Sequence, residues 1–511
     1  GDIVGSRAKP IGAPSFQLAD GLNPGYDAFK TLYKNRATVV YVGANDGIVH
    51  AFNGAMSGAG AGSEIFGYIP NALFAGPSSP SAPAVDGLAL LGNTDMDHHF
   101  LVNATPGNFD VDFTRTYNGS TVGSGTPDWH SILVGGLGKG GRAYYALDIT
   151  NPAAITAASA ASRETVAASK VLWEFTDSRL GFTYGEPVFV KTRKYGWTVI
   201  LPSGYNNPDG SGYIFFVNPR TGALLEAVST RTASSTVDTG LAHINAYVLD
   251  YTDGYADAVY GGDLNGNLWR FDISATSGTY PDPIVMARLT DSGGAAQPVT
   301  SRPLAELHPK TKSRVVLVGT GKLLSQDDRS STQEQTFYAI KDGNAVRFNA
   351  ASDLPTGVTF PIRRANLEPN PDWVTGVTSA AANSMGFYTD LGRGASGIAW
   401  RIVSDPATFL GIVTFTPTLP TITDPCSPSG VSRIYAGDFT TGLSVLVNSA
   451  GGVINALEVN TVVTDLRFLS VGGKSRLIAG TEKGDLLRPQ GNFGSTVGLR
   501  RINWREVNLG N

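Results

Sequence analysis

The chain is 511 residues long with 62 glycines, 29 prolines and 41% hydrophobic residues, which favours a turn-rich protein with a buried core over a disordered chain. Its net charge of −4 and its lack of a basic run exclude the electrostatic pattern that is typical of nucleic-acid-binding proteins. The single cysteine, Cys426, excludes an intrachain disulfide and a zinc site built from cysteines.

The first predicted elements are a short helix and a hairpin. Phe29, Leu32 and Tyr33 recur at helical spacing, which predicts a helix over Tyr26–Arg36. The segment YVGANDGIVHAF at Tyr41–Phe52 has two apolar strands around a glycine-containing turn. Because glycine takes the positive φ angles of such turns without steric cost, this segment predicts a β-hairpin.

The same hairpin recurs along the chain. Tyr, Gly, Gly and Phe fall at identical spacings in Tyr41–Phe52 and in YGGDLNGNLWRF at Tyr260–Phe271, and IAGTEKGDLLRP at Ile478–Pro489 keeps both glycines. Looser versions lie between them: Ser131–Ile149, Val199–Gly222, Val315–Ser325 with Gln335–Gly343, and Phe415–Gly442. Together these segments make seven units, each with an inner hairpin of apolar strands.

Seven repeated small sheets predict an all-β fold, a seven-bladed β-propeller. A small sheet cannot bury its faces alone, and radial stacking of such sheets gives a propeller. Because the units are longer than a plain blade of ~45 residues, we expect insertions at Phe74–Asp128, Pro152–Ser169 and Asn344–Met385. We also expect few helices and one domain over residues 1–511. A pair of β-sandwiches is the alternative fold that the pattern leaves open.

The best candidate for a site is the acidic turn DYTDGYAD, which begins at Asp250. Calcium binds carboxylate and carbonyl oxygens and needs a flexible loop to surround it. Asp250, Asp253 and Asp257 would supply side-chain oxygens and Tyr255 its backbone carbonyl, while Thr252 is a weaker candidate. The alternative is an Asp-Gly turn with solvated carboxylates, which is common between strands. Spacing alone leaves both interpretations open.

Three other patterns are weaker candidates. Asn207, Asp209 and Ser211 form a second oxygen-rich turn, for which a plain turn is the favoured interpretation. The carboxylates and histidines of Asp95–His99 resemble a metal cluster, but neighbouring histidines on a strand point to opposite faces. The glycines of Gly136–Gly141 match a dinucleotide-binding motif, but a β run follows them instead of the required helix, so we expect a hairpin corner.

Long motifs occur in order over nearly the whole chain: Tyr41–Phe52, Glu64–Leu73, Trp129–Pro152, Leu172–Val190, Ser203–Asn207, Gly262–Asp272, Val318–Leu324 and Arg501–Val507. With these motifs the chain resembles the C-terminal domain of PilC/PilY-type proteins, the large adhesins associated with the tips of type IV pili. The resemblance implies a modified seven-bladed propeller with a calcium loop just before the strand of the GDLNGNLW motif. The acidic turn lies at that position.

The acidic turn is one residue shorter than the loop of that family, whose usual pattern is D-x-[DN]-x-D-G-x-x-D. The resemblance implies Asp253, Tyr255 and Asp257 directly as calcium ligands. It implies Asp250 and Thr252 as ligands only if the shorter loop still surrounds the ion. The expected cofactor is therefore Ca²⁺, and the short loop bears on its affinity more than on its presence.

The resemblance also implies a function. Proteins of this type are non-enzymatic factors that promote type IV pilus biogenesis and sit at or near the pilus tip. They favour pilus extension over retraction when calcium is bound, and so support twitching motility, attachment and virulence. The expected partners are minor pilins of the tip, with host-cell or surface receptors as further candidates, and the expected location is the pilus tip, cell surface or outer membrane of a Gram-negative bacterium.

The apolar content and the start of the chain bear on its location. No apolar run approaches the ~20 residues that are needed to cross a bilayer, so we predict no transmembrane segment in this chain. The chain begins at Gly1 without a Met or a signal peptide. We interpret it as the C-terminal part of a longer exported adhesin, with its N-terminal domain and targeting segment outside it.

Two other functions stay open from the sequence. Quinoprotein-like dehydrogenases are also propellers and hold a calcium-bound cofactor, although many use a pair of neighbouring cysteines and this chain has only Cys426. A glycan-binding propeller is suggested by the aromatic residues and the polar turns, although most of the aromatic residues are better explained as core.

Overall fold

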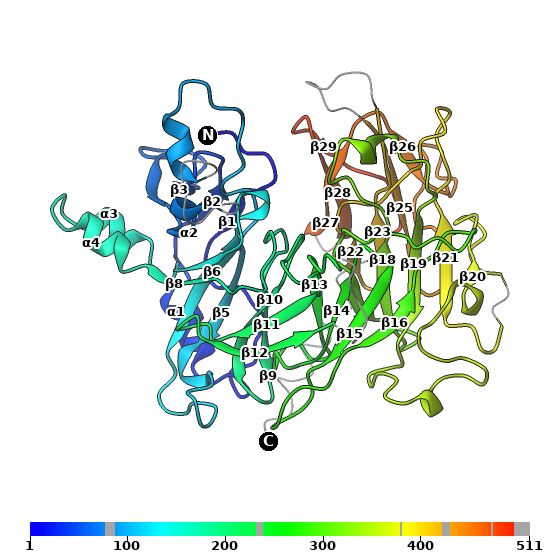
Figure 1. Ribbon diagram of the computed structural model, residues 1–511, viewed down its shortest axis with the longest axis horizontal. Coiled ribbons are helices and arrows are strands. Elements are labelled where there is room, and N and C mark those ends of the chain that lie inside the picture. Colours follow the sequence, from blue (N-terminus) through cyan, green and yellow to red (C-terminus); the bar gives the residue numbers. More distant parts are fainter. Residues whose placement is uncertain (77–86, 231–238, 379–380, 422–429, 472–473, 495–511) are drawn as a thin grey trace. The chain divides into compact units, whose positions relative to one another are not determined.

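The structure is a computed structural model that describes residues 1–76, 87–230, 239–378, 381–421, 430–471 and 474–494. Within these ranges strands dominate and the helices are few and short (Figure 1). The described strands form seven sheets that follow one another along the chain, which is the arrangement of a seven-bladed β-propeller. The predicted fold class is confirmed, while Cys426 and the motif Arg501–Val507 lie outside the described residues.

The first three sheets each have four antiparallel strands in chain order. The first contains β1 (Lys9–Ile11), β2 (Val39–Gly43), β3 (Val49–Asn53) and β4 (Glu64–Tyr68). The second contains β5 (Gly107–Asp112), β6 (Trp129–Gly136), β7 (Tyr144–Asp148) and β8 (Val171–Phe175). The third contains β9 (Val188–Thr192), β10 (Gly196–Pro202), β11 (Tyr213–Val217) and β12 (Leu224–Ser229).

The fourth sheet contains the boundary between two compact units of the chain. Its strands are β13 (Ile244–Val248), β14 (Ala256–Gly262), β15 (Asn267–Asp272) and β16 (Ile284–Arg288). The first unit consists of Gly1–Val259 with Phe271–Pro283, and the second of Tyr260–Arg270 with Ile284–Asn511. The expectation of one domain over residues 1–511 stays a prediction.

The last three sheets belong to the second unit. The fifth has the order β17-β18-β19-β21-β20, with strands β17 (Leu304–Leu307), β18 (Arg314–Gly319), β19 (Thr336–Lys341), β20 (Glu368–Pro369) and β21 (Gly386–Asp390). The sixth contains β22 (Ala407–Phe409), β23 (Ile412–Phe415), β24 (Thr418–Pro420), β25 (Gly430–Asp438) and β26 (Leu457–Val459). The seventh contains β27 (Val463–Val471), β28 (Lys474–Thr481) and β29 (Leu486–Leu487).

All seven predicted hairpins are found as neighbouring strands of one sheet. In the three copies with the closest spacing, a glycine with positive φ lies in the turn between the strands: Gly47, Gly266 and Gly484. The glycines at Gly136–Gly141 lie between β6 and β7, in the 3-10 turn η3 (Gly138–Gly140). A strand follows them, as expected, so they form a hairpin corner and not a phosphate-binding turn.

Helices occur only at the edges of this β framework in the described part of the chain. The predicted helix is present as α1 (Tyr26–Leu32), and it ends four residues earlier than predicted. Its buried side is formed by Tyr26 and Phe29, whereas Leu32 is 73% exposed, so the helix has one short apolar face and nothing to extend it. The other α-helices are α2 (Ala72–Ala75), α3 (Ala153–Ala157) and α4 (Arg163–Ala168).

The predicted insertions fold in different ways. The insertion at Pro152–Ser169 is confirmed, and its helices α3 and α4 project from the rest of the first unit (Figure 1). The expectation for Phe74–Asp128 is partly wrong, because this segment contains β5, the first strand of the second sheet. The segment Asn344–Met385 contains β20, which pairs in parallel with β21. Short 3-10 turns complete the described elements: η1 (Leu88–Gly92), η2 (Phe113–Arg115), η4 (Asp327–Ser330), η5 (Ala351–Asp353) and η6 (Arg364–Asn366).

The core of each unit lies between adjacent sheets. Every residue of β10, β11 and β18 is buried, which is expected for a strand that is covered on both faces. In the first unit the second and third sheets pack through Trp129, Trp197 and their neighbours. In the second unit Trp373 packs against Phe337 and Phe415, whose rings stack on each other. None of the described helices is long and apolar enough to cross a membrane.

The half-buried histidine His130 is expected to stabilise the second sheet, and this contribution can be tested. His130 on β6 has its two ring nitrogens 3.0 Å from Asp148 and 3.0 Å from Asp128, and its ring stacks on Phe113. Burial works against the charged imidazolium, but hydrogen bonding and charge from Asp148 and Asp128 outweigh it and raise the pKa of His130. The folded protein therefore binds this proton more tightly than the unfolded chain does.

We expect the contribution of His130 to be greatest below pH ~6.5 and to be lost as the pH rises through the raised pKa of the folded state. The substitution His130→Gln should lower the free energy of unfolding by up to about 1 kcal/mol at pH 6, and by less at pH 8.5. Denaturant unfolding of both proteins at the two pH values measures the difference. An NMR titration in which the His130 imidazole titrates below its ordinary range would contradict the prediction.

Candidate functional site

The acidic loop, residues 250–257, lies between β13 and β14 in the first unit and includes the first two residues of β14. Asp250 and Thr252 are exposed, whereas Asp253, Tyr255 and Asp257 are half-buried. The chain turns here because Gly254 takes a φ of 76°, which favours glycine. A Cβ on Gly254 would also lie 3.1 Å from the ring of the buried Trp197, so the loop packs directly on the core.

Hydrogen bonds within the acidic loop order two of its carboxylates. One oxygen of Asp250, Oδ1, accepts from Thr252 N at 2.9 Å and from Thr252 Oγ1 at 2.6 Å. Asp253 Oδ1 accepts from Tyr255 N at 2.8 Å. The backbone carbonyl of Asp250 accepts from the N–H groups of Asp253 and Gly254, both at 3.2 Å. The result is a closed turn in which each of these two carboxylates uses one oxygen for the loop itself.

The inner side of the acidic loop is attached to two other segments of the first unit. Gly254 O accepts from Lys191 N at 2.9 Å, which places the loop beside the end of β9. Thr252 O accepts from Ala19 N at 2.9 Å and from Asn23 Nδ2 at 2.7 Å. These contacts join the loop to a segment more than two hundred residues earlier in the chain, with a separation of 229 residues between Asn23 and Thr252.

A buried ammonium group completes this attachment. Lys191 is 6% exposed, and its Nζ donates to Leu22 O at 3.1 Å and to Asn23 Oδ1 at 2.8 Å. The same Nζ lies 4.6 Å from the centre of the Tyr255 ring. Burial lowers the pKa of Lys191 to about 8, and the carboxylate of Asp253 opposes that shift. We call the contacts of Lys191 and Thr252 with residues 19–23 the loop clamp.

The predicted ligands offer the right kind of donor for calcium, which prefers hard oxygen ligands. Asp250, Asp253 and Tyr255 lie at the turn, and Asp257 follows as the second residue of β14. The second oxygen of each of the first two carboxylates lies outside the bonds given above. Among the residues that the structure describes, however, no three His, Cys, Asp or Glu side chains form a group that could hold a metal by themselves. Backbone carbonyls would have to complete the shell, and the calcium role of this loop stays a prediction.

The two weaker candidates are ordinary polar contacts. The stretch Asp95–His99 is irregular and not a strand, and His98 Nε2 is 2.9 Å from Asp2 Oδ2. In the second oxygen-rich turn, Asp209 Oδ1 accepts from Asn207 Nδ2 at 3.1 Å and from Ser211 N at 3.0 Å. This is the plain turn that was the favoured interpretation.

The GDLNGNLW motif closes its hairpin around one buried carboxylate. Asp263 has no exposed surface, and its Oδ1 accepts from the N–H groups of Asn265 and Asn267, both at 2.8 Å. Its Oδ2 accepts from Asn267 Nδ2 and from Trp269 Nε1, also at 2.8 Å. Gly266 makes the turn with a φ of 72°. Burial raises the pKa of Asp263 against these four hydrogen bonds, and the motif is explained by folding alone.

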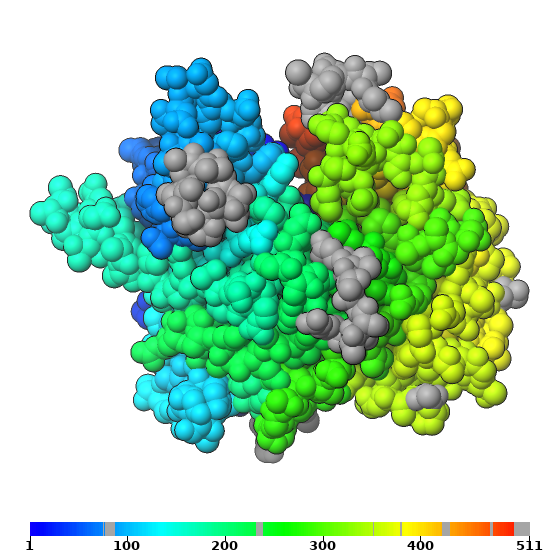
Figure 2. All heavy atoms as spheres, in the orientation of Figure 1, coloured from blue at the N-terminus to red at the C-terminus, as the bar shows by residue number. Residues whose placement is uncertain are grey.

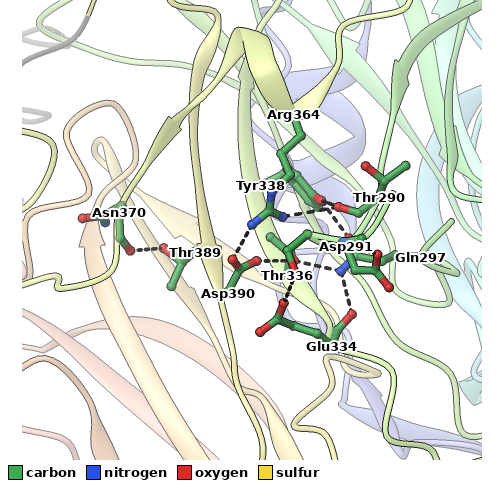
Figure 3. A network of polar contacts seen from close by, with 12 residues as sticks. Thr290, Asp291, Gln297, Glu334, Thr336, Tyr338, Arg364, Asn370, Thr389 and Asp390 are labelled. Atoms are coloured by element: carbon green, nitrogen blue, oxygen red, sulfur yellow. Dashed lines mark hydrogen bonds and ion pairs between the residues drawn. The ribbon is translucent and has the colours of Figure 1, made fainter. Parts of the chain in front are cut away.

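A second polar network lies in the second unit and is also structural (Figure 3). Tyr338 OH lies 2.7 Å from Gln297 Oε1, and Gln297 Nε2 donates to Thr336 Oγ1 at 2.8 Å. Thr336 Oγ1 in turn donates to Asp390 Oδ1 at 2.8 Å, and Asp390 pairs with Arg364. These contacts join β19, β21 and the connection after β16, so the network satisfies buried polar groups between strands.

Comparison with known proteins supports a pilus-associated family. Residues 1–358 match the family model of the PilY1 beta-propeller domain. The chain is 29% identical over 504 residues to the type IV pilus biogenesis factor PilY1 of Pseudomonas aeruginosa (strain UCBPP-PA14), covering 86% of this chain and 39% of that protein. It is 28% identical to a type IV pilus biogenesis factor PilY1 homolog of Xylella fastidiosa (strain Temecula1), covering 99% of this chain and 39% of that protein. The chain spans about two fifths of the length of these relatives.

The fold has a counterpart among solved structures. The crystal structure of the C-terminal domain of Pseudomonas aeruginosa PilY1 is similar to this chain with a TM-score of 0.67 and 23% sequence identity. The similarity covers 94% of this chain and 99% of that one. At this level of identity the likeness bears on the fold, and it agrees with the seven sheets described above.

Proposed function

The chain belongs to the family of PilY1 beta-propeller domains, and from this premise we propose that it is the calcium-binding, non-enzymatic propeller of a type IV pilus biogenesis factor. The match of residues 1–358 to the family is the observation that carries the proposal. The protein acts on the pilus at the bacterial surface, with minor pilins of the tip as partners and host-cell or surface receptors as further ones. It promotes pilus extension over retraction and thereby twitching motility and attachment.

The acidic loop is the part of the chain that we assign to calcium. Asp250, Asp253 and Asp257 would supply carboxylate oxygens and Tyr255 a carbonyl oxygen, with Thr252 as a weaker ligand. A bound calcium ion supplies positive charge that offsets the mutual repulsion of the three carboxylates. The loop clamp supports a regulatory role. Calcium would stiffen the outer side of the acidic loop, and the inner side of this loop is attached to residues 19–23.

Calorimetric titration of the protein with calcium tests the site. We expect one class of site in the wild-type protein and a Kd at least tenfold weaker in Asp257→Asn, because one ligand loses its charge while the side chain keeps its size. The matched control is Asp291→Asn, since Asp291 also accepts from backbone N–H groups in an exposed turn, at 3.0 and 2.9 Å. The control should bind like the wild type. Equal binding in all three proteins, or no binding in any of them, would remove calcium from the proposal.

The pilus role has a separate test in cells. The full-length protein that carries Asp257→Asn should restore fewer surface pili to a strain without the wild-type gene than the full-length protein that carries Asp291→Asn. Counting pili by electron microscopy, with and without deletion of the retraction motor, separates reduced extension from increased retraction. A normal number of pili for a variant that has lost calcium binding would show that the pilus role does not depend on this loop.

A further inference from the structure

A second site lies at the rim of the third sheet, and none of the residues that line it belongs to the acidic loop. Two adjoining hollows of about 800 and 630 Å³ are lined by the turn at residues 116–124, by β12, and by residues 193–195 and 276–279. They share Tyr117, Thr121, Val122 and Leu225, so they lie side by side, and we call the two together the rim groove. The segment around residues 116–124 projects as the cyan lobe at the lower left of Figure 2. Each hollow is within the ~300–1,000 Å³ that is typical of ligand pockets.

The walls of the rim groove are held in place by the fold. Tyr117 pairs with Val122 in a β-bridge, and Gly123 N donates to Thr116 O at 2.8 Å, so the segment is a hairpin. Asn218 Nδ2 donates to Tyr117 O at 2.8 Å and joins this hairpin to the third sheet. The ring of Tyr117 also meets that of Tyr195 edge-on at 5.3 Å. A ligand would therefore meet a surface that is already formed.

In the part of the chain that the structure describes, the rim groove contains one positively charged side chain that is paired with a carboxylate and two that are not. Lys194 Nζ is 2.5 Å from Glu226 Oε2, which also accepts from Tyr195 OH at 2.8 Å, so this ammonium is neutralised. Arg193 and Arg220 line the two hollows and are exposed. Among the described residues neither arginine forms an ion pair with a carboxylate, and the guanidinium of Arg193 lies over the Tyr255 ring at 5.1 Å. Two positive charges are therefore left for a ligand.

The rest of the lining suits a sugar. Short exposed hydroxyl side chains surround both hollows: Ser120, Thr121, Ser124, Thr221, Thr276 and Thr279. A hydroxyl both donates and accepts hydrogen bonds, as the hydroxyls of a saccharide do. A guanidinium binds a carboxylate through two parallel hydrogen bonds. We propose that the rim groove binds acidic oligosaccharides, with Arg193 and Arg220 holding carboxylates of two different sugar units.

The geometry of the edge strand favours a saccharide over an extended peptide. β12 is the outermost strand of its sheet, and an unpaired edge can in principle accept a further strand from a peptide. However, the pairing of β11 with β12 shifts between Phe216 and Val217, which leaves a bulge at Leu225, inside the groove. A bulge twists an edge and disrupts its hydrogen-bonding pattern. Side-chain chemistry, and not the backbone edge, is therefore what this surface presents.

Binding of defined hexasaccharides to the whole chain tests the proposal. The probes are an alginate hexamer, with a carboxylate on every unit, a hyaluronan hexamer, with one on alternate units, and neutral maltohexaose. We expect at least one acidic hexamer to bind, with an affinity that falls as salt is added, and maltohexaose to bind at least tenfold more weakly. The comparison of alginate with hyaluronan separates a microbial polysaccharide from an animal one as the source. Measurement in EDTA makes the result independent of the acidic loop.

The double variant Arg193→Gln with Arg220→Gln should lose at least tenfold in affinity for the acidic hexamer. The matched control is Arg288→Gln, an exposed arginine on β16 that does not line the groove. Equal circular dichroism spectra and melting temperatures show that both variants are folded. The proposal is overturned if neither acidic hexamer binds, if maltohexaose binds as tightly, or if the double variant binds like the control.

Discussion

The substitution Asp263→Ala is expected to lower the free energy of unfolding by about 4 kcal/mol, which is a large effect for one side chain. The carboxylate accepts four hydrogen bonds at 2.8 Å, from two backbone N–H groups, one amide and one indole. Alanine leaves these four donors, of which three are in buried hydrogen bonds, without an acceptor. Each buried donor without a partner costs about 1–3 kcal/mol. Relaxation of the turn recovers part of that sum. Denaturant unfolding followed by tryptophan fluorescence measures the loss.

A matched control separates burial from the loss of a turn residue. Asp291 also accepts from two backbone N–H groups of a tight turn, but its hydrogen bonds are exposed. Water can replace the carboxylate there, so Asp291→Ala should cost no more than about 1 kcal/mol. If Asp263→Ala and Asp291→Ala cost the same, the buried carboxylate does not organise the hairpin in the way proposed.

The repeat in the sequence predicted most of the fold, because each copy is a hairpin that its own residues determine. Each copy places glycine where a turn needs it between apolar strands, and Gly47, Gly266 and Gly484 all have positive φ in the structure. A hairpin depends on neighbours in sequence, so its residues reveal it. The first strand of the second sheet, β5, was missed because its partner is formed by long-range pairing with β6 and not by a turn motif.

For the acidic loop, the sequence predicted the carboxylates but not the contacts that attach the loop to the rest of the first unit. Asp250, Asp253 and Asp257 were found from their spacing around a glycine, and their calcium role stays a prediction. The loop clamp could not be found, because Lys191 and Asn23 are single polar residues without a motif. Only the fold brings them together with Thr252, because Asn23 is 168 residues from Lys191 and 229 residues from Thr252 along the chain. A lysine that directly follows three apolar residues of β9, in VFVK, was the one local signal.

The substitution Lys191→Met should loosen the acidic loop without unfolding the sheets. Methionine keeps much of the volume but cannot donate to Leu22 O or Asn23 Oδ1, so one partly buried and one buried acceptor lose their partner. That loss is worth about 2 kcal/mol, which corresponds to amide exchange roughly 30-fold faster. We expect this increase in residues 19–23 and 250–255, measured by hydrogen–deuterium exchange with mass spectrometry. Protection in β10 and β11 should not change.

The control for this prediction is Lys9→Met, which removes an ammonium group that is partly exposed instead of buried. Lys9 Nζ lies 3.6 Å from Glu186 Oε2, and both side chains are about one quarter exposed. A partly exposed pair of this kind contributes little, so exchange should hardly change. If Lys191→Met speeds exchange in only one of the two segments, they are not clamped together. Any effect of calcium on residues 19–23 would then have to arise without the loop clamp.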